Sequence, residues 1–215
     1  NNDGFTIGGT NITVTTSTAQ GNARWGYYAD GNYATLTGNN ASGNASIGFY
    51  IGVGAGNATV TGNTAQGNSS DGFYSKSNGG SSVVSSNTAR SNSGSGFDFF
   101  NSNNNTISNN VAHGNTSTGI TLEFNSANNL VSGNNLYDNG GSGSNSGILI
   151  SSGNNNEITG NRITDTAGTA YAIDIGFGVT GTYLSGNYFS GTGATSLRDQ
   201  GTATIFAGQR DGNGN

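Results

Sequence analysis

Tyrosine and carboxylate side chains recur at nearly constant intervals through the middle of this 215-residue sequence. Tyr28, Tyr50 and Tyr74 are 22 and 24 residues apart, and Asp98 follows after another 24. A second set, two residues further along in its repeats, comprises Asp30, Lys76, Phe100 and Glu123. Aromatic rings with polar tips can stack on sugar rings, while carboxylates accept hydrogen bonds from sugar hydroxyls. If the fold brings these eight residues to one surface, they form the predicted binding site for a polysaccharide.

Some of the same residues are also candidates for catalysis. In a lyase or epimerase, Tyr74 or Lys76 would abstract a proton next to a sugar carboxylate. In a glycoside hydrolase, Asp98 and Glu123 would supply the pair of carboxyl groups that the reaction needs. Because carboxylates outnumber Lys76 on this surface, an acidic polymer would be repelled and a neutral one is expected. The non-catalytic interpretation is that the tyrosines stabilise neighbouring strands and the carboxylates keep the surface soluble.

The single histidine needs separate consideration, because any imidazole base must be His113. The repeat places Arg90 and His113 in a third outward column, on adjacent coils. That column holds no acidic residue next to His113 that would orient its ring. We therefore interpret His113 as an ordinary surface residue.

An internal repeat of 22 to 28 residues must position all of these side chains. Each unit opens with a glycine and alternating apolar residues, at Gly4, Gly26, Gly48, Gly72, Gly96, Gly119, Gly147 and, with alanine instead, Ala172. The apolar segments are short and lack helical periodicity, so they predict strands. Such strands cannot bury a core alone, and each unit must stack on the next through parallel hydrogen bonds. The predicted fold is all-β, a single-stranded right-handed parallel β-helix of about eight coils.

Asparagine occupies one bend of nearly every unit, three residues after an apolar position. This column consists of Asn39, Asn63, Asn87, Asn110, Asn134, Asn161 and Asn187. Five residues later a second column runs from Asn22 to Asn139 and continues as Thr166 and Thr192. Stacked asparagine side chains can hydrogen bond to one another and to the turn backbone. Both columns therefore predict structural ladders rather than catalytic residues.

The chain divides into coils and a short terminal segment. Residues 1–197 are predicted to form the coils, and residues 198–215 a C-terminal cap or a linker to a following domain. The longest unit contains a glycine-rich insertion at residues 138–146, which could line a binding surface or form a passive bulge.

Charge and hydropathy argue against two classes of partner. The net charge of -5 argues against nucleic acid, and no apolar segment is long enough to span a membrane. The sequence starts in the middle of the repeat pattern, so we expect a part of a larger secreted protein, extracellular or at the cell surface.

No cofactor is predicted. Residues 211–215 begin like an Asp-x-Asn-x-Asn calcium loop, but the glycine and distal glutamate that such a loop needs do not follow within the sequence. Calcium is the one ion that this segment suggests. The absence of cysteine excludes disulfides and thiol catalysis.

Two repeat units resemble a known family. They read Asn63-Thr64-Ala65-Gln66-Gly67-Asn68 followed by Asp71-Gly72-Phe73, and Asn110-Val111-Ala112-His113-Gly114-Asn115 followed by Gly119-Ile120. These units are similar to coils of the mannuronan epimerase catalytic module and of related carbohydrate-active right-handed β-helices. The resemblance extends roughly from Gly48 to Leu197. It implies the fold and a carbohydrate substrate class.

The resemblance does not extend to the family's catalytic motif. Its members carry a Tyr-Gly-Phe-Asp-Pro-His segment on the first strand of a coil, assisted by an Asp and an Arg on later coils. Aligned on Gly48 and Phe49, the corresponding positions are occupied by Ile47, Tyr50, Gly52, Lys76 and Gly94. A match one coil earlier, at residues 25–30, also lacks the histidine. The resemblance therefore assigns no catalytic residue to this chain.

These observations predict an extracellular module that binds polysaccharide or serves as a rigid structural element, without catalysis of its own. One alternative is a polysaccharide-active enzyme, an epimerase, lyase or glycoside hydrolase. It would use the surface formed by the outward residues of the first strand of each coil. Another is a structural segment of a fibre, adhesin or phage tail.

Overall fold

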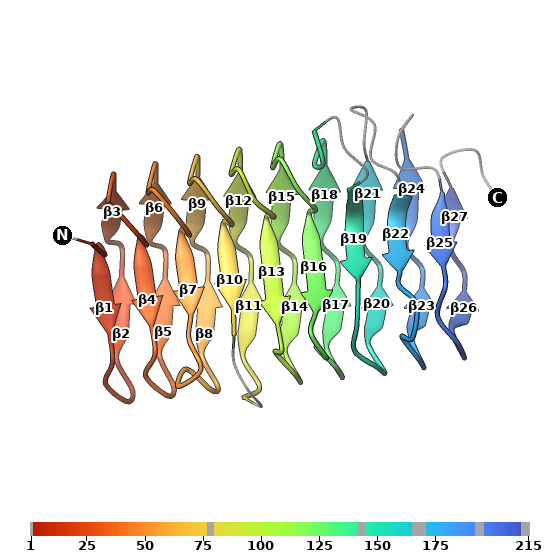
Figure 1. The fold of residues 1–215 in the computed structure, drawn as a ribbon, viewed down its shortest axis with the longest axis horizontal. Coiled ribbons are helices and arrows are strands. Elements are labelled where there is room, and N and C mark those ends of the chain that lie inside the picture. The colour runs from red at the N-terminus through yellow and green to blue at the C-terminus, as the bar shows by residue number, and fades with distance from the viewer. Residues whose placement is uncertain (1, 77–79, 142–144, 165–170, 192–195, 212–215) are drawn as a thin grey trace.

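The computed structural model describes residues 2–76, 80–141, 145–164, 171–191 and 196–211, and shows a rod of stacked coils (Figure 1). Each coil contributes one strand to each of three parallel sheets, and each sheet has nine strands. The predicted all-β solenoid is confirmed. None of the described segments is a helix long and apolar enough to span a membrane.

Strands of two to five residues make up the three sheets. The first sheet contains β1 (Phe5–Ile7), β4 (Tyr27–Ala29), β7 (Phe49–Ile51), β10 (Phe73–Ser75), β13 (Phe97–Phe100), β16 (Ile120–Glu123), β19 (Ser146–Ile150), β22 (Tyr171–Ile175) and β25 (Leu197–Asp199). The second contains β2 (Thr13–Thr15), β5 (Thr35–Thr37), β8 (Thr59–Thr61), β11 (Val83–Ser85), β14 (Thr106–Ser108), β17 (Leu130–Ser132), β20 (Glu157–Thr159), β23 (Tyr183–Ser185) and β26 (Ile205–Ala207). The third contains β3 (Thr18–Gln20), β6 (Asn40–Ser42), β9 (Thr64–Gln66), β12 (Thr88–Arg90), β15 (Val111–His113), β18 (Asn135–Tyr137), β21 (Arg162–Thr164), β24 (Tyr188–Ser190) and β27 (Arg210–Asp211).

Equivalent residues of successive coils are directly paired. Tyr28 pairs with Tyr50, Tyr50 with Tyr74, and Tyr74 with Asp98. Neighbouring strands lie about 4.8 Å apart, so each column of equivalent residues runs along the rod at that spacing. A position repeated in the sequence is therefore a line on the surface or in the core.

The core contains one such column of rings. Phe5, Tyr27, Phe49, Phe73 and Phe97 stack with ring centroids 4.6 to 4.8 Å apart and nearly parallel planes. Tyr27 is fully buried, and its hydroxyl has no hydrogen-bond partner among the described residues. The first strand of each coil thus fills the interior with its inward side chains, while the residue between them points outward.

The predicted asparagine ladder is confirmed. Asn87 is typical of it, because its backbone N–H and its Nδ2 both donate to Oδ1 of Asn110, at 2.9 and 3.1 Å. Its Nδ2 also donates to the carbonyl of Val60, at 2.8 Å. The same bonds connect the column from Asn39 to Asn187, where Gln209 continues it. The second column forms an equivalent ladder from Asn22 to Asn139, whereas Thr166 and Thr192 lie outside the described residues.

A further ladder was not predicted. It lies two residues before the inward apolar residue of the second sheet and comprises Ser82, Asn105, Asn129 and Asn156. Asn105, for example, donates from its backbone N–H and its Nδ2 to Oδ1 of Asn129, both at 2.9 Å. Alanine occupies the same column in two earlier coils, at Ala34 and Ala58. The column is therefore polar only in the later part of the rod.

The glycine that opens most coils is required by close packing. At Gly26, a β-carbon would lie 2.6 Å from the carbonyl oxygen of Gly48 and 2.8 Å from the β-carbon of Ala41. A side chain there would push adjacent coils apart. This explains why the repeat signature begins with glycine.

The terminal segment continues the stacking. Most of β25 and all of β26 and β27 lie within residues 198–215, for which a cap or linker was predicted. These strands pair with β22, β23 and β24. The described part of the segment therefore adds a ninth turn to the eight that were counted in the sequence.

Candidate functional site

The outward face of the first sheet carries a continuous line of aromatic rings, which we call the aromatic stripe. It consists of Trp25, Tyr28, Tyr50, Tyr74, Phe100 and Phe124. Ring centroids of Tyr28 and Tyr50 are 5.3 Å apart, and those of Tyr50 and Tyr74 are 5.0 Å apart. The stripe extends over five coils, from β4 to β16, or roughly 19 Å at the spacing of parallel strands. It contains all four aromatic residues of the predicted binding site.

Both ends of the stripe were missed in the sequence. Trp25, next to the repeated glycine, packs against Tyr28 and Tyr50 with centroids 4.7 and 4.6 Å away. Phe124 stacks on Phe100 at 4.1 Å and is 60% exposed. Its φ of 50° is unusual for a bulky residue, and Asn101, at the equivalent turn position of the preceding coil, has a similar φ of 47°. Neither residue lies in an alternating strand position, so strand periodicity gave no signal for them.

A carboxyl group without a donor lies beside the stripe. Asp98, on β13, is half-buried, and its Oδ1 is buried with no hydrogen-bond partner among the described residues. Burial, together with the negative charges of Glu123 and Asp71, raises the pKa of Asp98 to about 8. At neutral pH this side chain is therefore mainly a neutral acid, which can donate a proton or a hydrogen bond.

Two further carboxyl groups, those of Glu123 and Asp71, lie close enough to Asp98 to raise its pKa. Glu123, on β16, is offset by two residues across paired strands, which places its Cα about 8 Å from that of Asp98. Asp71, which was not predicted, accepts from the backbone N–H of Ser95 at 2.7 Å. Burial raises the pKa of Asp71 and of Glu123. Burial also raises the pKa of the Tyr74 hydroxyl, and the negative charges of Asp98 and Tyr50 raise it further. The predicted candidates Tyr74, Asp98 and Glu123 thus form one electrostatic cluster.

The remaining predicted residues flank the stripe. Oδ1 of Asp30, after β4, accepts from the backbone N–H of Gly54 at 2.8 Å. Lys76, after β10, places its Nζ 5.1 Å from the ring centroid of Phe100. All eight predicted binding residues therefore border the same face of the first sheet.

The charge of this face is smaller than the sequence indicated. Asp174 is buried on β22 and accepts two hydrogen bonds from Arg198, at 2.7 and 2.6 Å. Arg198 was assigned to the terminal segment, so its contribution to this face was not foreseen. With Asp174 paired and Asp98 largely protonated, the charges left on this face are those of Asp30, Asp71 and Glu123 against Lys76, a smaller excess of negative charge than the sequence predicted.

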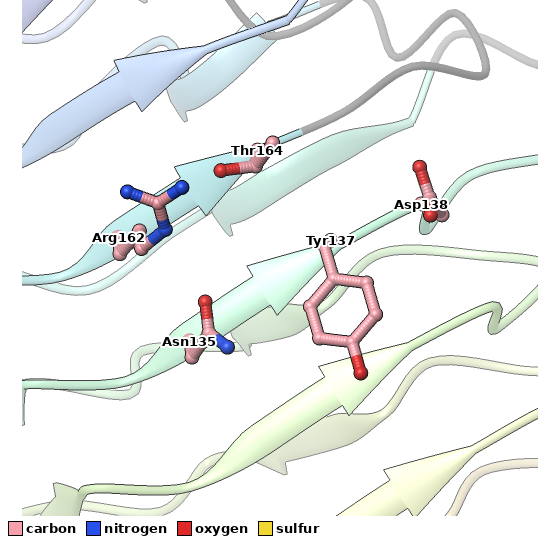
Figure 2. A pocket seen from close by; sticks show the side chains of 5 residues that line it. All are labelled: Asn135, Tyr137, Asp138, Arg162 and Thr164. Atoms are coloured by element: carbon pink, nitrogen blue, oxygen red, sulfur yellow. The ribbon is translucent and has the colours of Figure 1, made fainter.

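The outward face of the third sheet has a different character. Arg90 and His113 are paired in register there, as predicted, and the His113 ring stacks on Tyr137 with centroids 4.7 Å apart. Burial and the nearby Arg90 lower the pKa of His113, while Asp138 acts in the opposite direction. A hollow of about 260 Å³ lies next to this stack and is lined by Asn135, Tyr137, Asp138, Arg162 and Thr164 (Figure 2).

The glycine-rich insertion and the calcium-like segment are described only in part. Asp138, the first residue of the insertion, lines the hollow, while residues 142–144 lie outside the described ranges. Residues 212–215 of the calcium-like segment also lie outside them. Among the described residues, no three His, Asp or Glu side chains are arranged to hold a metal ion.

The fold is similar to several solved structures. The A-module of mannuronan C-5 epimerase AlgE6 from Azotobacter vinelandii has a TM-score of 0.76 and 20% identity, over 94% of this chain and 64% of that one. A structure described as a glycoside hydrolase has a TM-score of 0.55 and 11% identity, over 89% and 38%. DFA-IIIase from Arthrobacter chlorophenolicus A6, without its lid, has a TM-score of 0.53 and 19% identity, over 94% and 50%.

At identities of 20% or less, the structural similarity shows a shared fold. The chain spans less than two thirds of the length of each of the three structures. Comparison with curated protein sequences gives no match. The model of the family described as right handed beta helix region matches residues 1–92 and 53–210. The chain therefore belongs to the right-handed β-helix family.

Proposed function

We propose that the outward face of the first sheet binds a neutral polysaccharide that lies along the rod. The observation that carries this proposal is the aromatic stripe, a continuous line of six rings over five coils. Because each ring packs on its neighbours, the stripe presents an extended apolar strip with hydroxyl and carboxyl groups along it. Sugar rings offer the complementary pattern of apolar faces and hydroxyls.

Electrostatics favour a neutral polymer over a charged one. Asp98 is mostly protonated at neutral pH, and Arg198 neutralises Asp174. The carboxylates that remain, Asp30, Asp71 and Glu123, outnumber Lys76, so this face repels an acidic polymer and does not repel a neutral one. The names of two structural neighbours, a mannuronan epimerase and a glycoside hydrolase, support carbohydrate as the partner. An extracellular or cell-surface location, in a larger secreted protein, follows from this substrate class.

A glycan array with the purified chain tests the proposal. We expect binding to a neutral glycan, weakened roughly tenfold by Tyr50→Ala because one stacked aromatic ring is removed. Tyr183→Ala is the matched control, since Tyr183 is partly exposed on the second sheet, away from the stripe. Equal losses in both variants, or no neutral glycan bound at all, would contradict the proposal. The latter result would favour a purely structural segment of a fibre, adhesin or phage tail.

A second candidate function is the hydrolysis of the bound polysaccharide. The observation that favours it is the buried Oδ1 of Asp98, a neutral acid next to the carboxyl group of Glu123. A protonated acid beside a second carboxyl group is the arrangement that glycoside hydrolysis uses. In this function Asp98 protonates the leaving oxygen, and Glu123 activates a water or attacks the sugar.

Product release from a panel of neutral polysaccharides separates hydrolysis from binding. A hydrolase should release reducing ends, and Asp98→Asn should abolish this activity while retaining affinity for the glycan. If the wild-type chain binds a glycan but releases no product, the module binds without catalysis. If Asp98→Asn releases product at the wild-type rate, this catalytic assignment is wrong.

A further inference from the structure

The basic side chains of the rod are concentrated on one sheet. Three of the six Lys and Arg residues and the only histidine are on strands of the third sheet, namely Arg90, His113, Arg162 and Arg210. Two of the other three, Arg24 and Arg198, form ion pairs with aspartates. The carboxylates Asp30, Asp71 and Glu123 are on the side of the first sheet. Asp138, directly after β18, adds a carboxyl group to the third sheet, but the arginines outnumber it there. The two faces thus differ in charge, and the third sheet is the one suited to an anionic ligand.

The hollow on the third sheet has a simple structural origin. His113, Tyr137, Thr164 and Ser190 occupy one outward column on successive coils. The Tyr137 ring stacks on His113, toward the preceding coil, as Figure 2 shows by its direction away from Thr164. The next two side chains are short, and their hydroxyls contact each other at 3.0 Å. Space therefore opens where the column changes from rings to small residues.

Two charged side chains line this space, and Figure 2 shows Arg162 and Asp138 at opposite sides of it. The end at Arg162 is complementary to the carboxylate of a sugar, while Asp138 can accept hydrogen bonds from sugar hydroxyls. Arg162 is exposed, and its guanidinium carbon lies 5.0 Å from the ring centroid of Tyr188. A guanidinium presents parallel N–H donors that match a carboxylate. The Tyr137 ring offers an apolar surface, while Asn135 and Thr164 supply an amide and a hydroxyl for sugar hydroxyls (Figure 2).

We infer that this hollow binds a uronate unit of an acidic saccharide, with Arg162 contacting the carboxylate and Tyr137 contacting the ring. The site is separate from the aromatic stripe, because β18 and β21 belong to the third sheet and the stripe belongs to the first. The inference does not depend on the function proposed for the stripe. The rod would then hold a neutral and an acidic saccharide on different faces.

Calorimetric titration of the full chain with a tetramer of galacturonic acid tests the site. We expect saturable binding that weakens as salt is added, because the contact with Arg162 is ionic. The fully methyl-esterified tetramer has the same rings without the charge and should bind about tenfold more weakly or not at all. Tetraglutamate has the carboxylates without the sugar and should not bind.

Three variants locate the binding. Arg162→Gln should weaken the binding of the galacturonate tetramer about tenfold, because a charge-assisted hydrogen bond is lost. Thr164→Tyr should do the same with Arg162 intact, because it fills the hollow. Arg90→Gln is the matched control, since Arg90 is hydrogen bonded to Gln66 outside the hollow and its loss should change affinity less than about twofold.

Tyr50→Ala, on the stripe, should leave uronate binding unchanged. Equal affinity for the acid and its ester, or for tetraglutamate, would overturn the inference. Wild-type affinity in both the Arg162→Gln and the Thr164→Tyr variants would overturn it as well.

Discussion

The asparagine ladders and the carboxyl cluster beside the stripe both bring polar groups of neighbouring coils together, yet their hydrogen bonding differs. Away from the ends of the ladders each asparagine is buried and connected on both sides, as Asn87 is to Asn63 and Asn110. In the cluster, Asp98 has a buried oxygen that no described residue donates to, and its pKa is raised to about 8. Buried polar groups are normally satisfied, and exceptions require an explanation.

The difference distinguishes polar groups that stabilise the fold from polar groups that remain available to a ligand. The fully bonded column holds the coils together and has no capacity left for a ligand. The incompletely bonded carboxyl group is destabilising by itself, which is the usual property of groups kept for binding or catalysis. Substitutions in the ladder and at Asp98 should therefore change stability in opposite directions.

The largest effect is expected in the ladder. Asn87→Ala leaves the carbonyl of Val60 and the donors of Asn63 without their partner, all in the interior. We expect a loss of about 3 kcal/mol or more in unfolding free energy, measured by urea denaturation. Asn135→Ala removes a partly exposed asparagine and should cost less than about 0.5 kcal/mol. Equal losses in the two variants would contradict the structural role of the ladder.

A substitution at Asp98 is expected to increase stability. Its pKa is raised in the folded chain above the usual 3.8, so the stability it contributes is present below about pH 4 and is lost as pH rises to about 8. Asp98→Asn cannot ionise and should therefore become more stable than the wild type as pH increases. At pH 8.5 the gain should be about 2 kcal/mol, less than the full pKa shift implies because the side chain is partly solvated.

Thermal melts of both proteins from pH 4 to pH 9 provide the measurement. The lowered pKa of His113 makes the chain less stable as pH falls, but it does so in both proteins and cancels in the difference. A difference that stays constant with pH would show that Asp98 is ionised normally.

A smaller gain is expected at the other unsatisfied group. The Tyr27 hydroxyl is enclosed in the core ring stack and has no hydrogen-bond partner in the described part of the chain, so it serves neither the ladder nor the surface. Tyr27→Phe should raise the unfolding free energy by about 1 kcal/mol, again measured in urea. Tyr183→Phe, at a partly exposed ring, should be neutral. A destabilised Tyr27→Phe variant would mean that the hydroxyl has a partner after all.

Most of the fold could be predicted because the repeat is regular and the physical constraint is severe. Short strands bury a core only by stacking, so Gly26 and Asn87 had predictable environments once the coils were aligned. The ladder of Asn105 and Asn129 was missed because the same column holds Ala34 and Ala58 in earlier coils. The ninth turn was missed because residues 198–211 no longer carry the glycine and asparagine signature.

The site could be predicted only where strand alternation determines the side-chain direction. That rule placed Tyr50, Tyr74 and Asp98 on the outward face. It gave no direction for Trp25, Asp71 and Phe124, which lie at bends where the turn conformation decides. The electrostatic state of Asp98 could not be read from sequence, because it depends on burial and on carboxyl groups from two other coils.

The fluorescence of Trp25 tests the central claim most directly. It is the only tryptophan in the chain, and its ring lies within the stripe, 4.6 Å from that of Tyr50. Titration with the neutral oligosaccharide that binds best on the array should change its emission saturably, and Tyr50→Ala should reduce the apparent affinity. An emission that stays constant while calorimetry reports binding would place the sugar elsewhere on the rod and contradict the account.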